Sequence, residues 1–434
     1  MTNHDLWWKD AKIYELYVDK FAGDFKGLTS HLEYFVKLGI NTLHILPHYP
    51  SPMIDDGYDI KSYRAVRPEL GNMEDFTLFV QSAHALGIRI ITDFVLNHVS
   101  TEHSWFVEAR SSKYNPKRNF FLWSKDGHEF AGSTNAFPDM KPSNWIWNEP
   151  TSDFYYATFY AQQPDLNWDN PDLVQAMYAR MDFWADVGVD GFRLDAAPYL
   201  IKRNGTSSKG IPQTHQVIKN IRKHLDEKYP RGVILLAEAH QSVAETKTYF
   251  GNGDECQMAY HFPLMEQFWL ALQNGNNAGI KKMIEQSFDI PTNCAWAIFL
   301  RNHDEISLAT LPADERTRLV DFLDPQHQYY FAKAGATSMR IASVFDGDQG
   351  KARQAFELLY STPGAPIMYY GDEIGMKNLP VEAGIVDTRK YVRGNFNWPE
   401  ADRQIADPQS LFNVAASLTR RVPYEVTSHE SVEL

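Results

Sequence analysis

The alternation of short apolar runs with helical segments constrains the fold of this chain more than any other feature. Eight apolar runs have the length and composition of buried strands, at residues 13–17, 40–46, 88–94, 189–194, 233–237, 258–262, 296–300 and 367–370. Helical patterns lie between several of them, at residues 31–38, 74–86, 171–186 and 212–229. Strands that alternate with helices form parallel βα units, and eight such units close into a barrel. The sequence therefore predicts an α/β fold, a (β/α)8 TIM barrel.

The alternation is interrupted after the third predicted strand. Residues 99–169 are rich in Trp, Tyr, Asn, Ser and Pro and contain no long periodic segment. A stretch of this length is too long for a loop inside a compact domain, so it predicts an inserted subdomain. We expect residues 1–98 and 170–420 to form the barrel, 99–169 to form this subdomain B, and 421–434 to form a polar tail.

Composition excludes some partners. The 434 residues carry a formal net charge of -13, which disfavours nucleic acid and anionic membranes as partners. The only cysteines, Cys256 and Cys294, imply no disulfide framework. No apolar run is long enough for a membrane span, and the N-terminus lacks the apolar region of a secretory signal. We expect a cytoplasmic protein; the sequence is silent on its oligomeric state.

Arg193 and Asp195 lie where the fourth predicted strand ends. Residues two apart on a strand share a face, and a guanidinium beside a carboxylate keeps that carboxylate ionised. An ionised, desolvated aspartate is a candidate nucleophile. A lone Arg-x-Asp is also typical of a buried structural ion pair, so the rest of the chain has to distinguish the two interpretations.

Polar residues also gather at the ends of three other predicted strands. Strand three leads into Asp93-Phe-Val-Leu-Asn97-His98, strand five into Glu238, and strand seven into Arg301-Asn-His303-Asp304. In a TIM barrel these strand ends meet at the face that carries the active site. Each residue alone could be structural, but four clusters at four strand ends favour a catalytic site.

These motifs resemble the signature regions of the α-amylase family, glycoside hydrolase family 13. The matching segments are Asp93-x-x-x-Asn97-His98, Gly191-x-Arg193-x-Asp195, Glu238 and Asn302-His303-Asp304, with Gln163-Pro-Asp-Leu-Asn-Trp168 similar to a fifth region. Within the family, the segments at 50–60, 250–265, 299–305 and 369–375 resemble trehalose synthases. The resemblance implies an enzyme that cleaves or transfers α-linked glucose with retention, on a small α-glucoside or a short α-glucan.

The resemblance also implies roles for individual residues. Asp195 would be the nucleophile, Glu238 the acid/base, and Asp304 a third carboxylate that binds sugar hydroxyls. We expect burial and a nearby anionic Asp195 to raise the pKa of Glu238. His98 and His303 would hydrogen-bond the same glucose.

The segment Asp55-Asp-Gly-Tyr58 resembles the clamp that binds the non-reducing end of the substrate. Tyr58 would stack on the glucose ring, and Asp55 would bind its 4-hydroxyl. In relatives that act from chain ends, an arginine pairs with this aspartate, and Arg393 is the candidate here. Its flanking residues depart from the Thr-Pro pattern of trehalose synthases, so a surface arginine is the alternative. A complete clamp would restrict the enzyme to single glucose units.

Three departures from the family limit what the resemblance implies. The loop at residues 19–24 supplies few oxygen ligands, so we predict no calcium there and no cofactor, although Asn97 could belong to another calcium site. Ala196 and Ala197 leave the linkage preference open. A C-terminal β-sandwich would need roughly a hundred more residues, so we expect it to be absent or vestigial.

Alternative functions remain open at this level. The enzyme could hydrolyse maltose or short α-glucans as an α-glucosidase or amylase does. A catalytically silent binding protein on the same barrel is a more remote alternative. A metal hydrolase that uses Asp93, His98, His303 and Asp304 is disfavoured, because these histidines lack the close spacing of zinc sites.

Overall fold

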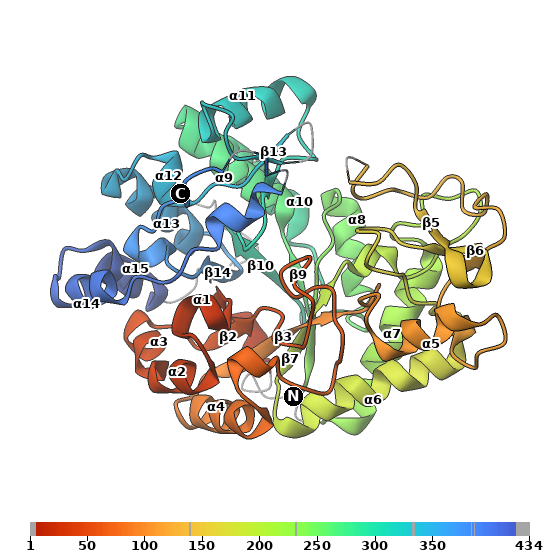
Figure 1. Ribbon diagram of the computed structural model, residues 1–434. Coiled ribbons are helices and arrows are strands. Elements are labelled where there is room, and N and C mark those ends of the chain that lie inside the picture. The colour runs from red at the N-terminus through yellow and green to blue at the C-terminus, as the bar shows by residue number, and fades with distance from the viewer. Residues whose placement is uncertain are drawn as a thin grey trace.

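The computed structural model describes residues 6–138, 140–230, 232–331, 335–382, 384–385 and 387–421. Its centre is a closed barrel of eight parallel strands in the order β1-β2-β3-β7-β8-β9-β10-β14 (Figure 1). The strands are β1 (Ile13–Leu16), β2 (Thr42–Ile45), β3 (Arg89–Val95), β7 (Gly191–Asp195), β8 (Ile234–Ala237), β9 (Met258–Tyr260), β10 (Ala295–Phe299) and β14 (Ala365–Tyr369). All eight predicted strands are present, and the TIM barrel is confirmed.

Helices surround this barrel (Figure 1). They include α2 (Phe25–Ser30), α3 (Leu32–Leu38), α4 (Met73–Ala85), α6 (Pro171–Val187), α7 (Pro212–Lys228), α8 (Val243–Lys247), α9 (Phe262–Asn274), α10 (Ala278–Ser287), α13 (Gln349–Ser361), α14 (Trp398–Ala406) and α15 (Leu411–Thr419). Gly188 ends α6 in the left-handed conformation, at φ 118°. The fourth strand therefore begins at Gly191, two residues later than predicted.

Two small antiparallel sheets lie outside the barrel. The segment between β3 and α6 contains α5 (Ser104–Ser111) and a sheet of β4 (Trp123–Ser124), β5 (Trp145–Asn148) and β6 (Asp153–Tyr156). A second sheet, between β10 and β14, combines β11 (Ile306–Ser307), β12 (Tyr330–Phe331) and β13 (Ala336–Thr337). The second sheet was not predicted, because two-residue strands show no alternation.

The division into barrel, subdomain B and tail stays a prediction. The tail lies outside the described residues beyond position 421. Among the described residues, no helix has the length and apolar character needed to cross a lipid bilayer.

Charged side chains fill one layer of the barrel interior. Glu15 on β1 is in register with His44 on β2, and Asp93 on β3 is in register with Arg193 on β7. His44 joins the two pairs, with Nδ1 at 3.1 Å from Glu15 and Nε2 at 3.0 Å from Asp93. Buried charges are costly unless they are paired, and here each has a partner of opposite charge. This layer forms the base on which the site is built.

Candidate active site

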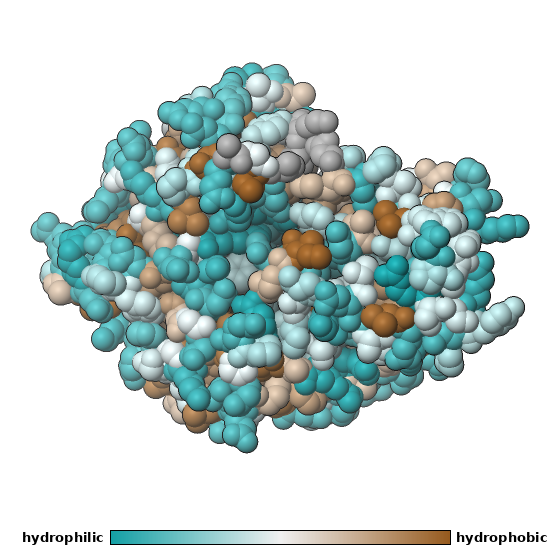
Figure 2. Space-filling model, in the orientation of Figure 1, coloured by the Kyte–Doolittle hydropathy of each residue, from teal (hydrophilic) through white to brown (hydrophobic). Residues whose placement is uncertain are grey.

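A cavity of about 410 Å³ opens at the carboxyl ends of the barrel strands. In the space-filling view, a hollow lies between the part that carries β5 and β6 and the part that carries α11 (Ala313–Leu323) (Figure 2). Six predicted site residues line the cavity: Asp55, Tyr58, His98, Asp195, Glu238 and Asp304. The other three, Arg193, His303 and Arg393, are buried and contact members of that set. The structure therefore brings all nine together.

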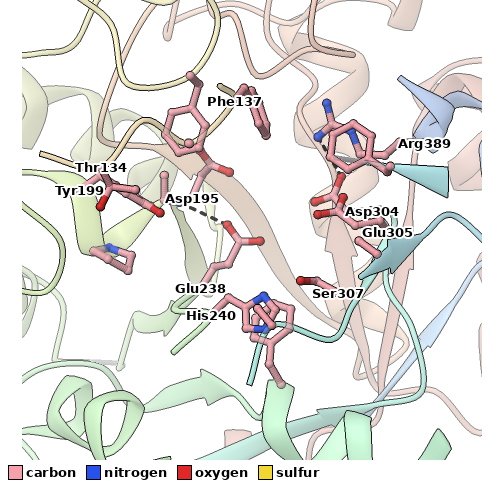
Figure 3. Close-up of a pocket in the computed structure, with 18 of the residues that line it drawn as sticks. Thr134, Phe137, Asp195, Tyr199, Glu238, His240, Asp304, Glu305, Ser307 and Arg389 are labelled. Carbon is pink, nitrogen blue, oxygen red and sulfur yellow. Dashed lines mark hydrogen bonds and ion pairs between the residues drawn. The ribbon is translucent and has the colours of Figure 1, made fainter. Parts of the chain in front are cut away.

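Arg193 connects the two candidate catalytic carboxyl groups. Its Nη1 donates to Asp195 Oδ1 at 2.8 Å and to Asp93 Oδ1 at 2.5 Å, and its Nη2 donates to Glu238 Oε1. The predicted pairing of Arg193 and Asp195 on one face is present. Figure 3 shows Asp195 and Glu238 next to each other in the cavity. Two carboxyl groups on one guanidinium favour the short separation of retaining glycosidases, about 5–5.5 Å, over the longer one of inverting enzymes.

We expected Arg193 to keep Asp195 ionised, but the pKa of Asp195 is raised and not lowered. Burial raises the pKa of Asp195 well above its usual range; Arg193 opposes this shift, and the charge of Glu238 adds to it. One guanidinium faces three carboxyl groups, so it cannot compensate all of them.

Asp304 is held by His303 and by two arginines. His303 Nε2 lies 3.1 Å from Asp304 Oδ2, and His303 Nδ1 lies 3.0 Å from Glu15 Oε1. Burial lowers the pKa of His303, but the charges of Asp304 and Glu15 outweigh it and raise the value to about 10. Despite its burial, Asp304 has a pKa well below the usual range, chiefly because of His303. Asp304 is therefore ionised at neutral pH.

The partner of Asp55 is Arg389 and not Arg393. Arg389 Nη2 donates to Asp55 Oδ1 at 3.0 Å, and Gln163 Nε2 donates to Asp55 Oδ2 at 2.9 Å. Arg393 instead donates to Asp304 Oδ1 at 2.8 Å and pairs with Asp56. The prediction that Arg393 pairs with Asp55 was wrong. It failed because η9 (Thr388–Val392) places the earlier arginine over Asp55.

Tyr58 and His98 line the cavity near these charges. The Tyr58 hydroxyl lies 2.7 Å from His303 Nε2, and the two rings stack at 5.5 Å. Burial lowers the pKa of His98 to about 4, so its imidazole is neutral at pH 7. Its Nε2 is buried without a hydrogen-bond partner among the described residues, which leaves it available to a ligand hydroxyl.

Sequence reasoning missed many of the residues that line the cavity. They are Thr134, Asn135, Phe137, Tyr199, Lys209, His240, Phe262, Glu305, Ser307, Arg316 and Arg389. Figure 3 places His240 beside Glu238, and Glu305 beside Asp304. Their closeness in sequence to catalytic candidates could have identified these two. The others come from loops and helix starts that carry no local signal.

Lys202 binds the Asn97 side chain, which was considered above as a calcium ligand. Its Nζ donates to Asn97 Oδ1 at 2.8 Å and to the Tyr199 carbonyl at 2.5 Å, and it pairs with Asp165. These oxygens are of the kind that calcium prefers, but the ammonium occupies the space between them, so they do not fit a metal. Within the described part of the chain, no group of three or more His, Cys, Asp or Glu side chains is placed to hold one.

Comparison with known proteins places this geometry in a family. The alpha-amylase catalytic domain matches residues 2–325. A trehalose synthase of Thermus thermophilus is 41% identical over 92% of this chain and 41% of its own length. A trehalose synthase/amylase of Mycolicibacterium smegmatis is 41% identical over 86% of this chain and 64% of its own length. The chain thus spans about two fifths to two thirds of the length of these relatives.

A solved structure supports the same assignment. A trehalulose synthase variant in complex with Tris superposes with a TM-score of 0.76 at 27% identity, over 95% of this chain and 84% of the other. The match in sequence and the match in fold thus cover nearly the same residues. The chain belongs to the α-amylase family, glycoside hydrolase family 13.

Proposed function

We propose that this protein transfers single α-linked glucose units with retention, and that it interconverts maltose and trehalose. The observation that carries the proposal is the contact of both Asp195 and Glu238 with the Arg193 guanidinium at the end of a polar cavity. The 41% identity to proteins described as trehalose synthases supports this choice of substrate. Hydrolysis of maltose or short α-glucans is the second candidate.

The reaction follows from the positions of the two carboxyl groups. Asp195 attacks C1 of the glucose, the C1–O bond breaks, and the leaving oxygen takes the proton of Glu238. In the second step, Glu238 accepts a proton from a hydroxyl of the acceptor sugar, whose oxygen attacks C1 and releases Asp195. Two inversions at C1 give net retention.

Asp304, His98 and Tyr58 surround the position that the transferred glucose would occupy. Asp304 is ionised and can accept hydrogen bonds from two hydroxyls, and His98 offers an unpaired nitrogen. Asp55 and Arg389 close the far end of this space. We call the part around Asp55, Tyr58, Asp304 and Arg389 the donor half, and the part around Tyr199, Lys209, His240, Phe262 and Arg316 the acceptor half.

Incubation with maltose, followed by separation of the products, tests the proposal. Trehalose is the expected product, because an acceptor sugar held in the cavity beside Glu238 outcompetes water. Glucose alone would replace the proposal by hydrolysis, and no turnover of maltose, trehalose, sucrose or short α-glucans would refute it. Asp195→Asn should lower turnover by on the order of 10⁴-fold or more, whereas the exposed Asp314→Asn should not change it. Unchanged turnover in Asp195→Asn would favour a binding protein, and loss of activity with a chelator would favour a metal hydrolase.

A further inference from the structure

The cations of the donor half are all neutralised by carboxylates. Arg193 contacts Asp93, Asp195 and Glu238. Arg389 and Arg393 likewise each pair with at least two carboxylates, drawn from Asp55, Asp56, Asp304 and Asp387. Among the described residues of this half, no arginine is left without a carboxylate partner to attract an anion.

The acceptor half differs because two cations lack such partners. Lys209 Nζ makes one hydrogen bond, to the carbonyl oxygen of His240 at 3.0 Å. Burial lowers the pKa of Lys209, and the closest acidic influence, Glu245, accepts hydrogen bonds from Ser242. Among the described residues, no carboxylate lies within 4 Å of the Lys209 ammonium.

Arg316 reaches the same cavity from α11. Its guanidinium has no hydrogen bond or ion pair with any described residue, although it lines the cavity. Gly335 makes room for it: a Cβ at this position would lie 2.0 Å from Arg316 Cδ, and the backbone has a φ of +113°. A side chain at residue 335 would thus displace Arg316, so the glycine holds open the path along which the guanidinium enters the cavity.

Lys209 lies on the side of the cavity where Glu238 exchanges its proton. His240, whose carbonyl it binds, follows Glu238 by two residues and stacks on Phe262 at 4.4 Å. The oxygen that Glu238 protonates belongs to the leaving or acceptor sugar. Lys209 therefore faces the acceptor and not the transferred glucose, and Arg316 lines the same cavity.

We propose that the acceptor half binds a sugar that carries a phosphate. This inference rests on the proposed function and specifies its acceptor. Two separate unpaired cations match a phosphomonoester, which carries nearly two negative charges at pH 7, better than a carboxylate with one. Glu305 also lines the cavity and would oppose such an anion when ionised, but burial and the charge of Asp304 raise its pKa to about 7.

Binding of acceptor sugars tests the proposal without catalysis. Glucose 6-phosphate should bind the protein about tenfold more tightly than glucose or glucuronate, measured by calorimetry. Lys209→Met and Arg316→Gln should each remove most of that difference. The exposed Lys223→Met and Arg318→Gln, on α7 and α11, are matched controls that should retain it. Equal affinity for the three sugars would overturn the proposal, and equal affinity of glucuronate and glucose 6-phosphate would overturn the choice of phosphate.

Kinetics separates this proposal from the proposed function. Trehalose and trehalose 6-phosphate share an unmodified donor glucose and differ only at the acceptor. We expect kcat/KM to be at least about tenfold higher for the phosphorylated sugar, and this ratio to fall about tenfold in Arg316→Gln. Turnover of maltose and trehalose without a preference for the phosphate would overturn this inference and leave the proposed function intact. Tight binding of glucose 6-phosphate without turnover of any α-glucoside would support the phosphate site and overturn the proposed function.

Discussion

The donor half and the acceptor half of the cavity are built in different ways. The donor half stands on the charged layer of the barrel, which is built from two pairs in register on adjacent strands, Glu15 with His44 and Asp93 with Arg193. The acceptor half is formed by loops and by the start of α11, and its cations lack carboxylate partners. The paired charges of the donor half fix the geometry of bond cleavage. The unpaired cations of the acceptor half remain available to bind an anionic group of the acceptor sugar. In an α/β barrel, chemistry is set by strand ends and specificity by the loops above them.

Replacement of Lys202, which is buried beside Asp165 and Asn97, should give the largest loss of stability. Lys202→Met leaves the Asp165 side chain fully buried, and its remaining hydrogen bonds from described residues come from the backbone and hydroxyl of Thr158. Loss of one member of a buried ion pair costs about 3–5 kcal/mol, and we expect the free energy of unfolding in urea to fall by this amount. The exposed Lys223→Met should change it by less than about 0.5 kcal/mol. A decrease of less than about 1 kcal/mol in the free energy of unfolding of Lys202→Met would contradict the view that Asp165 depends on the Lys202 charge.

The same cluster predicts the response to metal removal. Because the Lys202 ammonium already binds Asn97, Tyr199 and Asp165, a chelator should leave the unfolding midpoint of the wild-type protein unchanged. A lower midpoint after chelation would mean that a metal competes with the lysine for these oxygens.

Within the donor half, the two arginines should have separable effects. Arg389→Gln removes a charge-assisted hydrogen bond to Asp55 and should lower kcat/KM for maltose about 10- to 100-fold. In double-mutant cycles with Asp55→Asn, Arg389→Gln should show a coupling above about 1 kcal/mol, whereas Arg393→Gln should show a coupling near zero. Strong coupling of Asp55 to Arg393 would restore the prediction from sequence and contradict the observed pairing.

This contrast also explains how far the sequence could predict the structure. The eight strands and the residues at their ends follow from local patterns, since apolar β-branched runs end in polar motifs. Arg389 could not be selected over Arg393 from sequence, because the backbone path of η9 decides which one reaches Asp55. Lys209 and Arg316 lie 107 residues apart and share only the cavity. Their proximity depends on how α11 and the loop that carries Lys209 are placed over the barrel, and no local sequence pattern indicates that placement.

The last prediction concerns Glu305, which follows Asp304 in the chain and also lines the cavity. Burial and the charge of Asp304 raise its pKa to about 7 in the folded protein, against about 4.3 in an unfolded chain. The folded state therefore holds its proton more tightly, and stability is lost as pH rises through 7. Glu305→Gln should remove this penalty and raise the free energy of unfolding by about 1–3 kcal/mol at pH 8, with the gain shrinking towards pH 5. The exposed Glu357→Gln should show no such dependence. A Glu305→Gln protein less stable than wild type at pH 8 would mean that this carboxylate has a stabilising cationic partner, and that the cations of the cavity are more fully paired than the comparison of its two halves implies.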